Sequence, residues 1–142
     1  MDSARPQPDE DALAVTVQST AAVATVWRSL TADRADWWPG MRFDAVPGGL
    51  LREIWMENDV ESHAWGQVRE VQDGEVLTVD WRELGWPCPL SVRFALAPNA
   101  NATFISLTEC GFDGLPNGLV SHADHSDGWN YHLNRLRRQA ER

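Results

Sequence analysis

The sequence predicts one α+β domain, in which an antiparallel sheet of about seven strands is combined with two short helices after the first strand and a long C-terminal helix. Its 142 residues are the length of a single domain and suffice to bury a core without disulfides or metal. From about residue 41 to 110, apolar residues alternate with polar ones, which is the period of a strand. From about residue 118 to 141, the period becomes helical and proline is absent. Together these observations predict the fold class.

The domain is expected to begin near residue 13. Residues 1–12 contain four acidic residues, two prolines and almost nothing apolar, which predicts a disordered N-terminal tail. Apolar residues then alternate with small or polar ones, so we predict the first strand over 13–19. The chain is therefore expected to consist of this tail and one domain over 13–142.

Two short helices are predicted between the first strand and the rest of the sheet. The first has apolar residues at i, i+3, i+4 and i+7, namely Val23, Val26, Trp27 and Leu30. Such a stripe must pack against the sheet, and Ser19 or Thr20 is expected to cap this helix. The second helix is predicted over 32–37. It ends before Pro39-Gly40, because a residue that precedes proline is disfavoured in the helical conformation.

Six strands are predicted between residues 41 and 110, because turn residues such as Pro47-Gly48-Gly49 and Asp73-Gly74 divide this stretch. The later strands show the alternation most clearly. Their predicted inward residues are Leu77, Val79 and Trp81 in one strand and Leu90, Val92, Phe94 and Leu96 in the next. Strands of this kind form a sheet with one apolar face and one face in water.

The C-terminal helix has one face that is expected to be buried. On a helical wheel with about 100° per residue, six side chains fall within about 60° of Leu133. They are Leu119, His122, Ser126, Trp129, Leu136 and Ala140. The predicted buried face therefore contains a histidine.

Composition argues against several classes of partner. The chain has 12 Arg, no Lys and 21 acidic residues, which gives a net charge of −9. Phosphate backbones and anionic membranes are bound by many basic side chains, so we expect no nucleic acid and no membrane insertion. The sequence lacks a run of about 18 apolar residues, and its N-terminus is polar where a signal peptide would be apolar, which predicts a cytoplasmic protein. The two cysteines are too few for a disulfide scaffold and lack metal-site spacing.

Several short motifs follow one another over about residues 13 to 140. They are Val26-Trp27-Arg28-Ser29-Leu30-Thr31, Trp37-Trp38, Phe43-Asp44 with Pro47-Gly48-Gly49, Gly66-x-Val68-x-Glu70-Val71, Leu77-x-Val79-x-Trp81, Thr103-x-Ile105-x-Leu107-Thr108 with Gly111-Phe112, and Gly128-Trp129 with Leu133 and Leu136. In order and spacing, the sequence resembles the START-like superfamily, also called the SRPBCC, helix-grip or polyketide cyclase superfamily. It is most similar to the branch named after homologues of the heat-shock-protein ATPase activator (AHSA-type).

The resemblance implies a helix-grip fold, in which a curved sheet wraps around the C-terminal helix and encloses an apolar cavity. It implies binding of a small hydrophobic or aromatic molecule without a cofactor, in a monomer or homodimer. One alternative is an enzyme of the polyketide cyclase or aromatase kind that uses acid and base groups in the cavity. Another is a chaperone-interacting protein; the activator itself uses an additional N-terminal domain that we do not find in this sequence.

Two polar residues are candidates for binding or catalysis. His122 lies on the predicted inward face of the helix, where a neutral imidazole can orient a ligand or act as an acid or base. Glu109 follows Ile105 and Leu107 in period two and would also point inward, where burial would raise the pKa of its carboxyl. Alternatively, the strand ends by residue 108 and Glu109 turns to water, or His122 reaches solvent near the start of its helix.

The remaining candidate ligand residues are aromatic or apolar side chains around these two. The full predicted set is Trp37, Trp38, Trp81, Phe94, Leu107, Glu109, His122, Ser126, Trp129 and Leu133. Trp55 and Trp65 are further wall candidates whose strand register is not determined. We predict no metal site, because His125 and His132 lie about 60° to 80° to one side of His122 on the helical wheel and no Cys or carboxylate completes a recognisable ligand set.

Overall fold

The seven strands of this protein form one antiparallel sheet, described over residues 12–142 by a computed structural model. The strands are β1 (Ala12–Ser19), β2 (Met41–Phe43), β3 (Leu50–Glu57), β4 (Val60–Gln72), β5 (Val76–Glu83), β6 (Leu90–Asn99) and β7 (Ala102–Cys110). Their order across the sheet is β1-β7-β6-β5-β4-β3-β2, so β2 to β7 form a meander and β1 pairs with the last strand. This arrangement confirms the predicted fold class.

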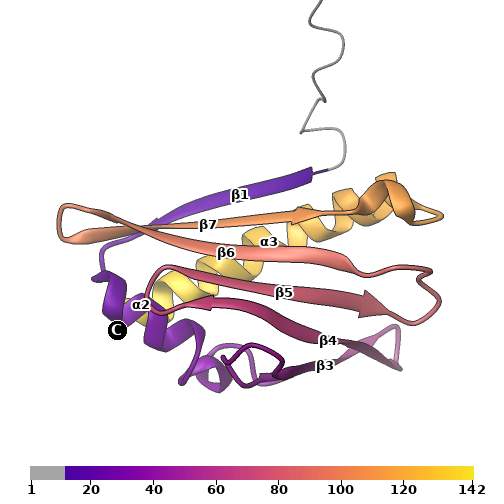
Figure 1. Cartoon of the computed structure of the whole chain (residues 1–142), viewed down its shortest axis with the longest axis horizontal. Helices are drawn as coiled ribbons and strands as arrows, with labels where there is room; N and C mark the ends of the chain where they lie inside the picture. The colour runs from indigo at the N-terminus through magenta and orange to yellow at the C-terminus, as the bar shows by residue number, and fades with distance from the viewer. Residues whose placement is uncertain (1–11) are drawn as a thin grey trace, which may run out of the picture.

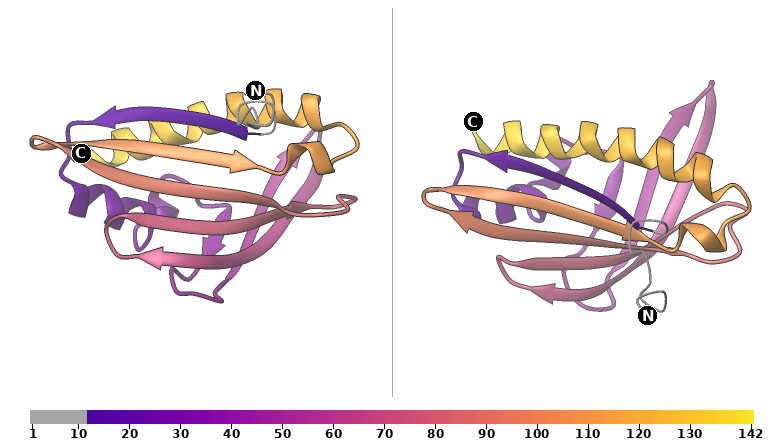
Figure 2. Two further views of the ribbon diagram at one scale, coloured as in Figure 1. Left: turned by 45° about the horizontal axis from the view of Figure 1, so that its top comes forward. Right: turned by 90° about the horizontal axis from the view of Figure 1, so that it is seen from above.

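The helices occupy one face of the sheet. They are α2 (Val23–Leu30), α3 (Gly118–Ala140) and two single turns of 3-10 helix, η2 (Arg34–Asp36) and η3 (Phe112–Gly114). The long α3 runs along the face of the sheet, and the far strands β3 and β4 bend toward it (Figures 1 and 2). The sheet therefore grips the helix as the family resemblance implies.

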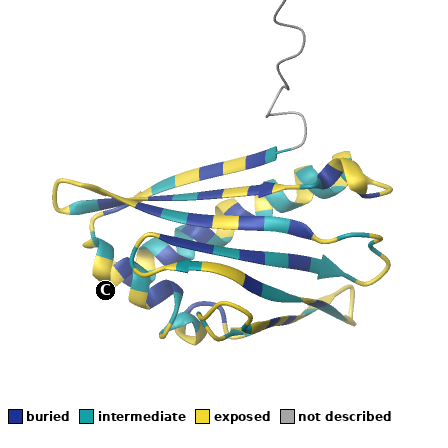
Figure 3. Ribbon diagram, viewed as in Figure 1, coloured by how far each residue is buried: buried dark blue, intermediate teal, exposed yellow. Residues whose placement is uncertain are grey.

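The core lies between α3 and the inward side chains of the sheet. Ile105 and Leu107 on β7 and Leu133 and Leu136 on α3 are completely buried. Along β6 and β7, buried residues alternate with less buried ones, as period two requires (Figure 3). Burying such side chains is the main source of stability in a domain of this size.

A close approach between β4 and β5 depends on Gly66. A Cβ at this position would clash with the backbone carbonyl of Asp80 on β5. Two residues further on, the β4–β5 register shifts between Val68 and Glu70. Interruptions of a strand ladder, such as β-bulges, bend a strand and increase its twist.

The structure corrects three details of the predicted helices. The first helix begins at Val23, so the capping position is Ala22 and neither Ser19 nor Thr20 caps it. The Ser19 hydroxyl instead donates to Glu141 Oε2 at 3.2 Å. The second is only the single turn η2. Leu119, predicted to be buried, is 88% exposed, and the first fully buried side chain of α3 is that of Trp129.

Of the tail predicted over 1–12, residues 1–11 lie outside the described residues, and Ala12 is the first residue of β1. No helix in the described part of the chain is both long enough and apolar enough to span a bilayer.

Candidate functional site

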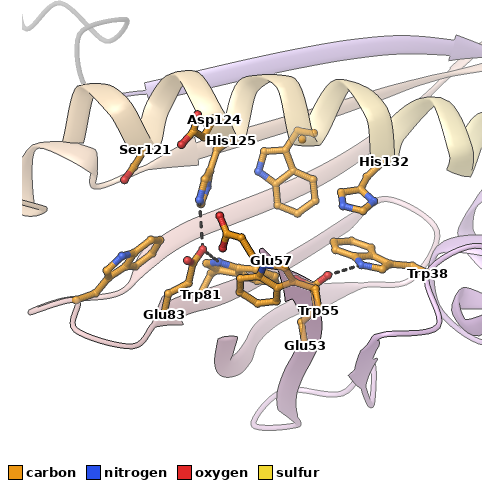
Figure 4. A pocket seen from close by; sticks show the side chains of 13 residues that line it. Trp38, Glu53, Trp55, Glu57, Trp81, Glu83, Ser121, Asp124, His125 and His132 are labelled. Carbon is orange, nitrogen blue, oxygen red and sulfur yellow. Dashed lines mark hydrogen bonds and ion pairs between the residues drawn. The ribbon is translucent and has the colours of Figure 1, made fainter. Parts of the chain in front are cut away.

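A pocket of about 370 Å³ opens between the N-terminal half of α3 and the strands β3 and β5 (Figure 4). The sheet contributes Glu53, Trp55 and Glu57 from β3 and Trp81 and Glu83 from β5. The loops contribute Trp38 and Trp86, and the helix contributes Ser121, Asp124, His125, Gly128, Trp129 and His132. Five of the eight tryptophans of the chain therefore line one pocket.

The spacing of these residues follows from the elements that carry them. Lining residues on β3 and β5 are two positions apart, so their side chains point to the same face of the sheet. Those on α3 are spaced mainly three or four apart, which places them along one side of the helix. Gly128 leaves room on this side, since a Cβ there would meet no atom within 4 Å.

The aromatic rings of the pocket pack against one another. Trp38 and Trp129 meet edge to face, with ring centroids 5.5 Å apart and an interplanar angle of 81°. Trp81 lies 6.5 Å from Trp38 and 6.1 Å from Trp129. Behind them, Phe94 meets Trp129 edge to face at 5.8 Å. These contacts hold the indoles in fixed orientations, and aromatic pairs of this geometry contribute about 0.5–1.5 kcal/mol each beyond their burial.

His132 belongs to this aromatic wall. Its ring stacks on Trp38 at 4.1 Å and 18°. Burial, assisted by the positive charge of Arg135, lowers the pKa of His132 to about 4, so the imidazole is neutral at neutral pH. Its Nδ1 is buried and has no hydrogen-bond partner.

His125 lies between two carboxylates. Its Nδ1 donates to Glu109 Oε1 at 2.8 Å, and its Nε2 lies 3.4 Å from Glu83 Oε2. Burial, the largest single effect, disfavours the imidazolium, but the hydrogen bonds and charges of the two carboxylates outweigh it and raise the pKa of His125 to about 9. The ring is therefore a cation at neutral pH. Among the described residues, no cluster of His, Cys, Asp and Glu is arranged to hold a metal ion.

Glu109 is completely buried on the inner side of His125. Its Oε1 also accepts a hydrogen bond from Trp129 Nε1 at 2.9 Å, while its Oε2 has no hydrogen-bond partner. The alternative in which the strand ends by residue 108 is wrong, because β7 continues to Cys110 by pairing with both β1 and β6. Gly111, with a φ of 108°, then turns the chain.

Glu53 is a second buried carboxylate, and it lines the pocket directly. Only 9% of the residue is exposed, and its Oε2 accepts a hydrogen bond from Trp38 Nε1 at 2.6 Å. Burial is the main cause that raises the pKa of Glu53 to about 7, and the charge of Glu83 adds to it against the opposing hydrogen bond from Trp38.

Three of the predicted ligand residues line the pocket, namely Trp38, Trp81 and Trp129. Phe94, Leu107 and Leu133 are buried in the core. Trp37 is also buried, and its indole donates to the carbonyl of Ser29 at 2.7 Å. Glu109 touches the pocket only through His125 and Trp129.

His122 and Ser126 lie outside the pocket lining. His122 Nε2 is 3.0 Å from the carbonyl oxygen of Ala12, and its ring packs against Phe112 at 5.1 Å. His122 therefore ties α3 to the edge strand β1. His125 takes the place that the sequence analysis gave to His122, because the pocket opens on the neighbouring side of the helix.

Sequence reasoning missed the acidic part of the lining. Glu53 and Glu83 share their strand faces with the apolar residues Leu51 and Trp81, so the alternation contained a signal for inward carboxylates. Nothing in the sequence indicated that these two strands meet the same segment of α3.

A sheet that wraps around a C-terminal helix and leaves a pocket between them defines a helix-grip protein of the START-like superfamily. The family model described as "Activator of Hsp90 ATPase homolog 1-like protein" matches residues 20–141, and the chain belongs to this family. No curated protein sequence matches the chain.

Solved structures share this fold at low sequence identity. DynU16, a protein of the dynemicin biosynthetic locus, is 24% identical with a TM-score of 0.74, and the match covers 90% of this chain but only 46% of DynU16. CalU16 from Micromonospora echinospora is 19% identical with a TM-score of 0.70, covering 91% of this chain and 75% of CalU16. CV1439 from Chromobacterium violaceum is 19% identical with a TM-score of 0.76, covering 94% and 99% of the two chains.

Proposed function

We propose that this protein binds a small aromatic molecule in the tryptophan-lined pocket between α3 and strands β3 and β5. The observation that carries the proposal is the pocket itself, with five indoles around about 370 Å³. Small-molecule sites in proteins have volumes of roughly 300–1,000 Å³ and combine apolar walls with a few polar groups that set orientation.

The residues of the site have distinct proposed roles. Trp38, Trp81 and Trp129 form a rigid wall on which a flat ligand stacks. Trp55 is only partly buried and closes the pocket on the β3 side. His125 orients polar groups of the ligand, and Glu109 is a positioning residue that holds the His125 ring through Nδ1.

Binding is tested with 1-N-phenylnaphthylamine, a neutral aromatic probe whose fluorescence rises in an apolar site. We expect saturable binding, which Trp55→Ala weakens by about fivefold, because one aromatic contact is worth about 0.5–1.5 kcal/mol. Trp65→Ala is the matched control, because Trp65 lies on β4 outside this pocket and is 42% exposed. Absence of saturable binding, or equal losses in the two variants, contradicts the proposal.

A second candidate function is acid catalysis on a bound carbonyl compound, as in the polyketide cyclase alternative. The favouring observation is the buried Glu109 that hydrogen-bonds His125, since a carboxylate that orients an imidazole is a common acid–base arrangement. With a pKa of about 9, His125 would act as the proton donor at neutral pH. A His125→Gln variant that still binds product but has lost turnover supports catalysis; unchanged turnover excludes it.

A further inference from the structure

The pocket has an excess of negative charge. Four carboxylates line it, on Glu53, Glu57, Glu83 and Asp124, and none of its lining residues is Arg although the chain has 12. The one cation in the lining is His125, which is already paired with Glu83 and with Glu109 behind it. Glu53, Glu57 and Asp124 form no ion pair with another residue of the lining.

Glu53 is the carboxylate that most needs a partner. It is nine-tenths buried, yet among the described residues it accepts a hydrogen bond from one indole N–H and forms no ion pair. The His125 cation attracts it from a distance, but this attraction is weaker than the repulsion by Glu83. Buried acidic groups in proteins are normally paired with a cation or held by several donors. A positively charged ligand group beside Glu53 would supply what the chain does not, and the raised pKa of Glu53 is consistent with this missing partner.

The rings around these carboxylates have the chemistry that such a ligand needs. Indole is the side chain that attracts cations most strongly to its face, and aromatic cages are the usual receptors for quaternary ammonium groups. Trp38 and Trp129 stand edge to face, so their faces point in different directions around the pocket. Trp38 also donates its N–H to Glu53, which joins ring and carboxylate into one unit.

We propose that the ligand of this pocket is an organic cation, with an amine or quaternary ammonium group near Glu53 and an aromatic body against the tryptophans. This inference rests on the proposed function and narrows it to one class of ligand. Its corollary is that fatty acids and other carboxylates are poor ligands, because the lining carboxylates repel them.

The test compares three phenols that differ in the charge of one substituent. (4-Hydroxyphenyl)trimethylammonium and 4-tert-butylphenol have nearly the same shape, because the cation differs only by nitrogen in place of the central carbon; 4-hydroxybenzoate is the anion. Their affinities are measured by calorimetry and by displacement of 1-N-phenylnaphthylamine. We expect the cation to bind about tenfold or more tightly than its neutral counterpart, and the anion to bind most weakly.

Charge-removing variants test which carboxylates cause the preference for the cationic phenol over the neutral one. Glu53→Gln removes the charge but keeps an oxygen that can accept from Trp38, so the fold should be retained. Glu57→Gln provides a second variant at an exposed position of the lining. Glu75→Gln, in the exposed turn between β4 and β5, makes the same charge change outside the pocket and is the control. We expect the first two to reduce the cation preference several-fold and the control to leave it unchanged.

The outcomes separate the two proposals. If 4-tert-butylphenol binds as tightly as the cation, or if Glu75→Gln lowers the preference as much as the pocket variants, the cation inference is overturned while the ligand pocket stands. If neither the phenols nor 1-N-phenylnaphthylamine bind, the proposed function fails as well.

Discussion

The protonated state of His125 is expected to stabilise this fold, and the stability should decrease above neutral pH. The ring lies between Glu109 and Glu83, and its pKa is raised from 6.5 to about 9. The folded state therefore holds a proton that the unfolded chain loses. This contribution is fully present below pH 6.5 and is lost as the pH rises through about 9.

The size of the effect follows from the two pKa values. At about 1.4 kcal/mol for each pH unit, the rise from 6.5 to about 9 corresponds to roughly 3 kcal/mol. Solvent screening reduces this free energy only slightly, because the His125 side chain is 17% exposed and that of Glu109 is completely buried. A loss of this size is a large fraction of the stability of a small domain.

Two other groups, Glu53 and His132, change the free energy of unfolding at lower pH, and their effects have opposite signs. Glu53 has its pKa raised from 4.5 to about 7, so its contribution decreases as the pH rises between these values. His132 has its pKa lowered from 6.5 to about 4, so stability rises with pH in that interval. At pH 7 Glu53 is about half titrated and adds only about 0.4 kcal/mol to the change above this pH, so the change reports mainly on His125.

The assay is urea unfolding followed by tryptophan fluorescence at pH 7 and pH 9.5, for the wild type and His125→Gln. We expect the wild type to lose about 3 kcal/mol between these pH values and the variant to lose much less. At pH 7 the variant should already be less stable by about 3 kcal/mol, because Glu109 loses its cationic partner in the core. His63→Gln is the control, since its ion pair with Glu61 is exposed and contributes at most about 1 kcal/mol.

Equal pH dependence in wild type and His125→Gln would refute this reasoning. So would a direct titration of the His125 ring by NMR that gives a pKa at or below 6.5. Either result would mean that burial outweighs the two carboxylates.

Two glycine substitutions provide further tests. Gly66→Ala should destabilise the protein by about 2 kcal/mol or more in thermal or urea unfolding, because its Cβ would clash with the Asp80 carbonyl; a variant as stable as the wild type contradicts this close approach. Gly128→Ala should stabilise α3 by up to about 1 kcal/mol and weaken binding of 1-N-phenylnaphthylamine, because the new methyl group points into the pocket; unchanged probe affinity would place the probe elsewhere.

The order and type of the elements could be predicted from the sequence because periodicity is a local property. Leu77, Val79 and Trp81 alternate in the sequence and are all buried on β5. The same holds for the helical stripe, where Trp129 and Leu133 pack into the core. A segment that must bury one face shows this pattern whatever its partner is.

The candidate site could be predicted only in part, because a helical wheel assigns an angle and not a neighbour. His122 and His125 are three residues apart, so their side chains are separated by roughly 60° on the helical wheel. Both lie close enough to the buried side of the helix to reach the sheet. His122 meets the edge strand β1, whereas His125 meets the carboxylates of β5 and β7. Which histidine lines the pocket depends on the position along α3 at which the bent sheet and the helix separate to form it.

The sequence by itself therefore determined the α+β class, the strand and helix order and most of the apolar core of this protein. Only the tertiary structure decided that Glu53, Glu83, Glu109 and His125 meet around five tryptophans. The physical reason is that burial patterns repeat along the chain every two or 3.6 residues. The contacts of the site instead join residues far apart in sequence, and they depend on the bend of β3 and β4 toward α3.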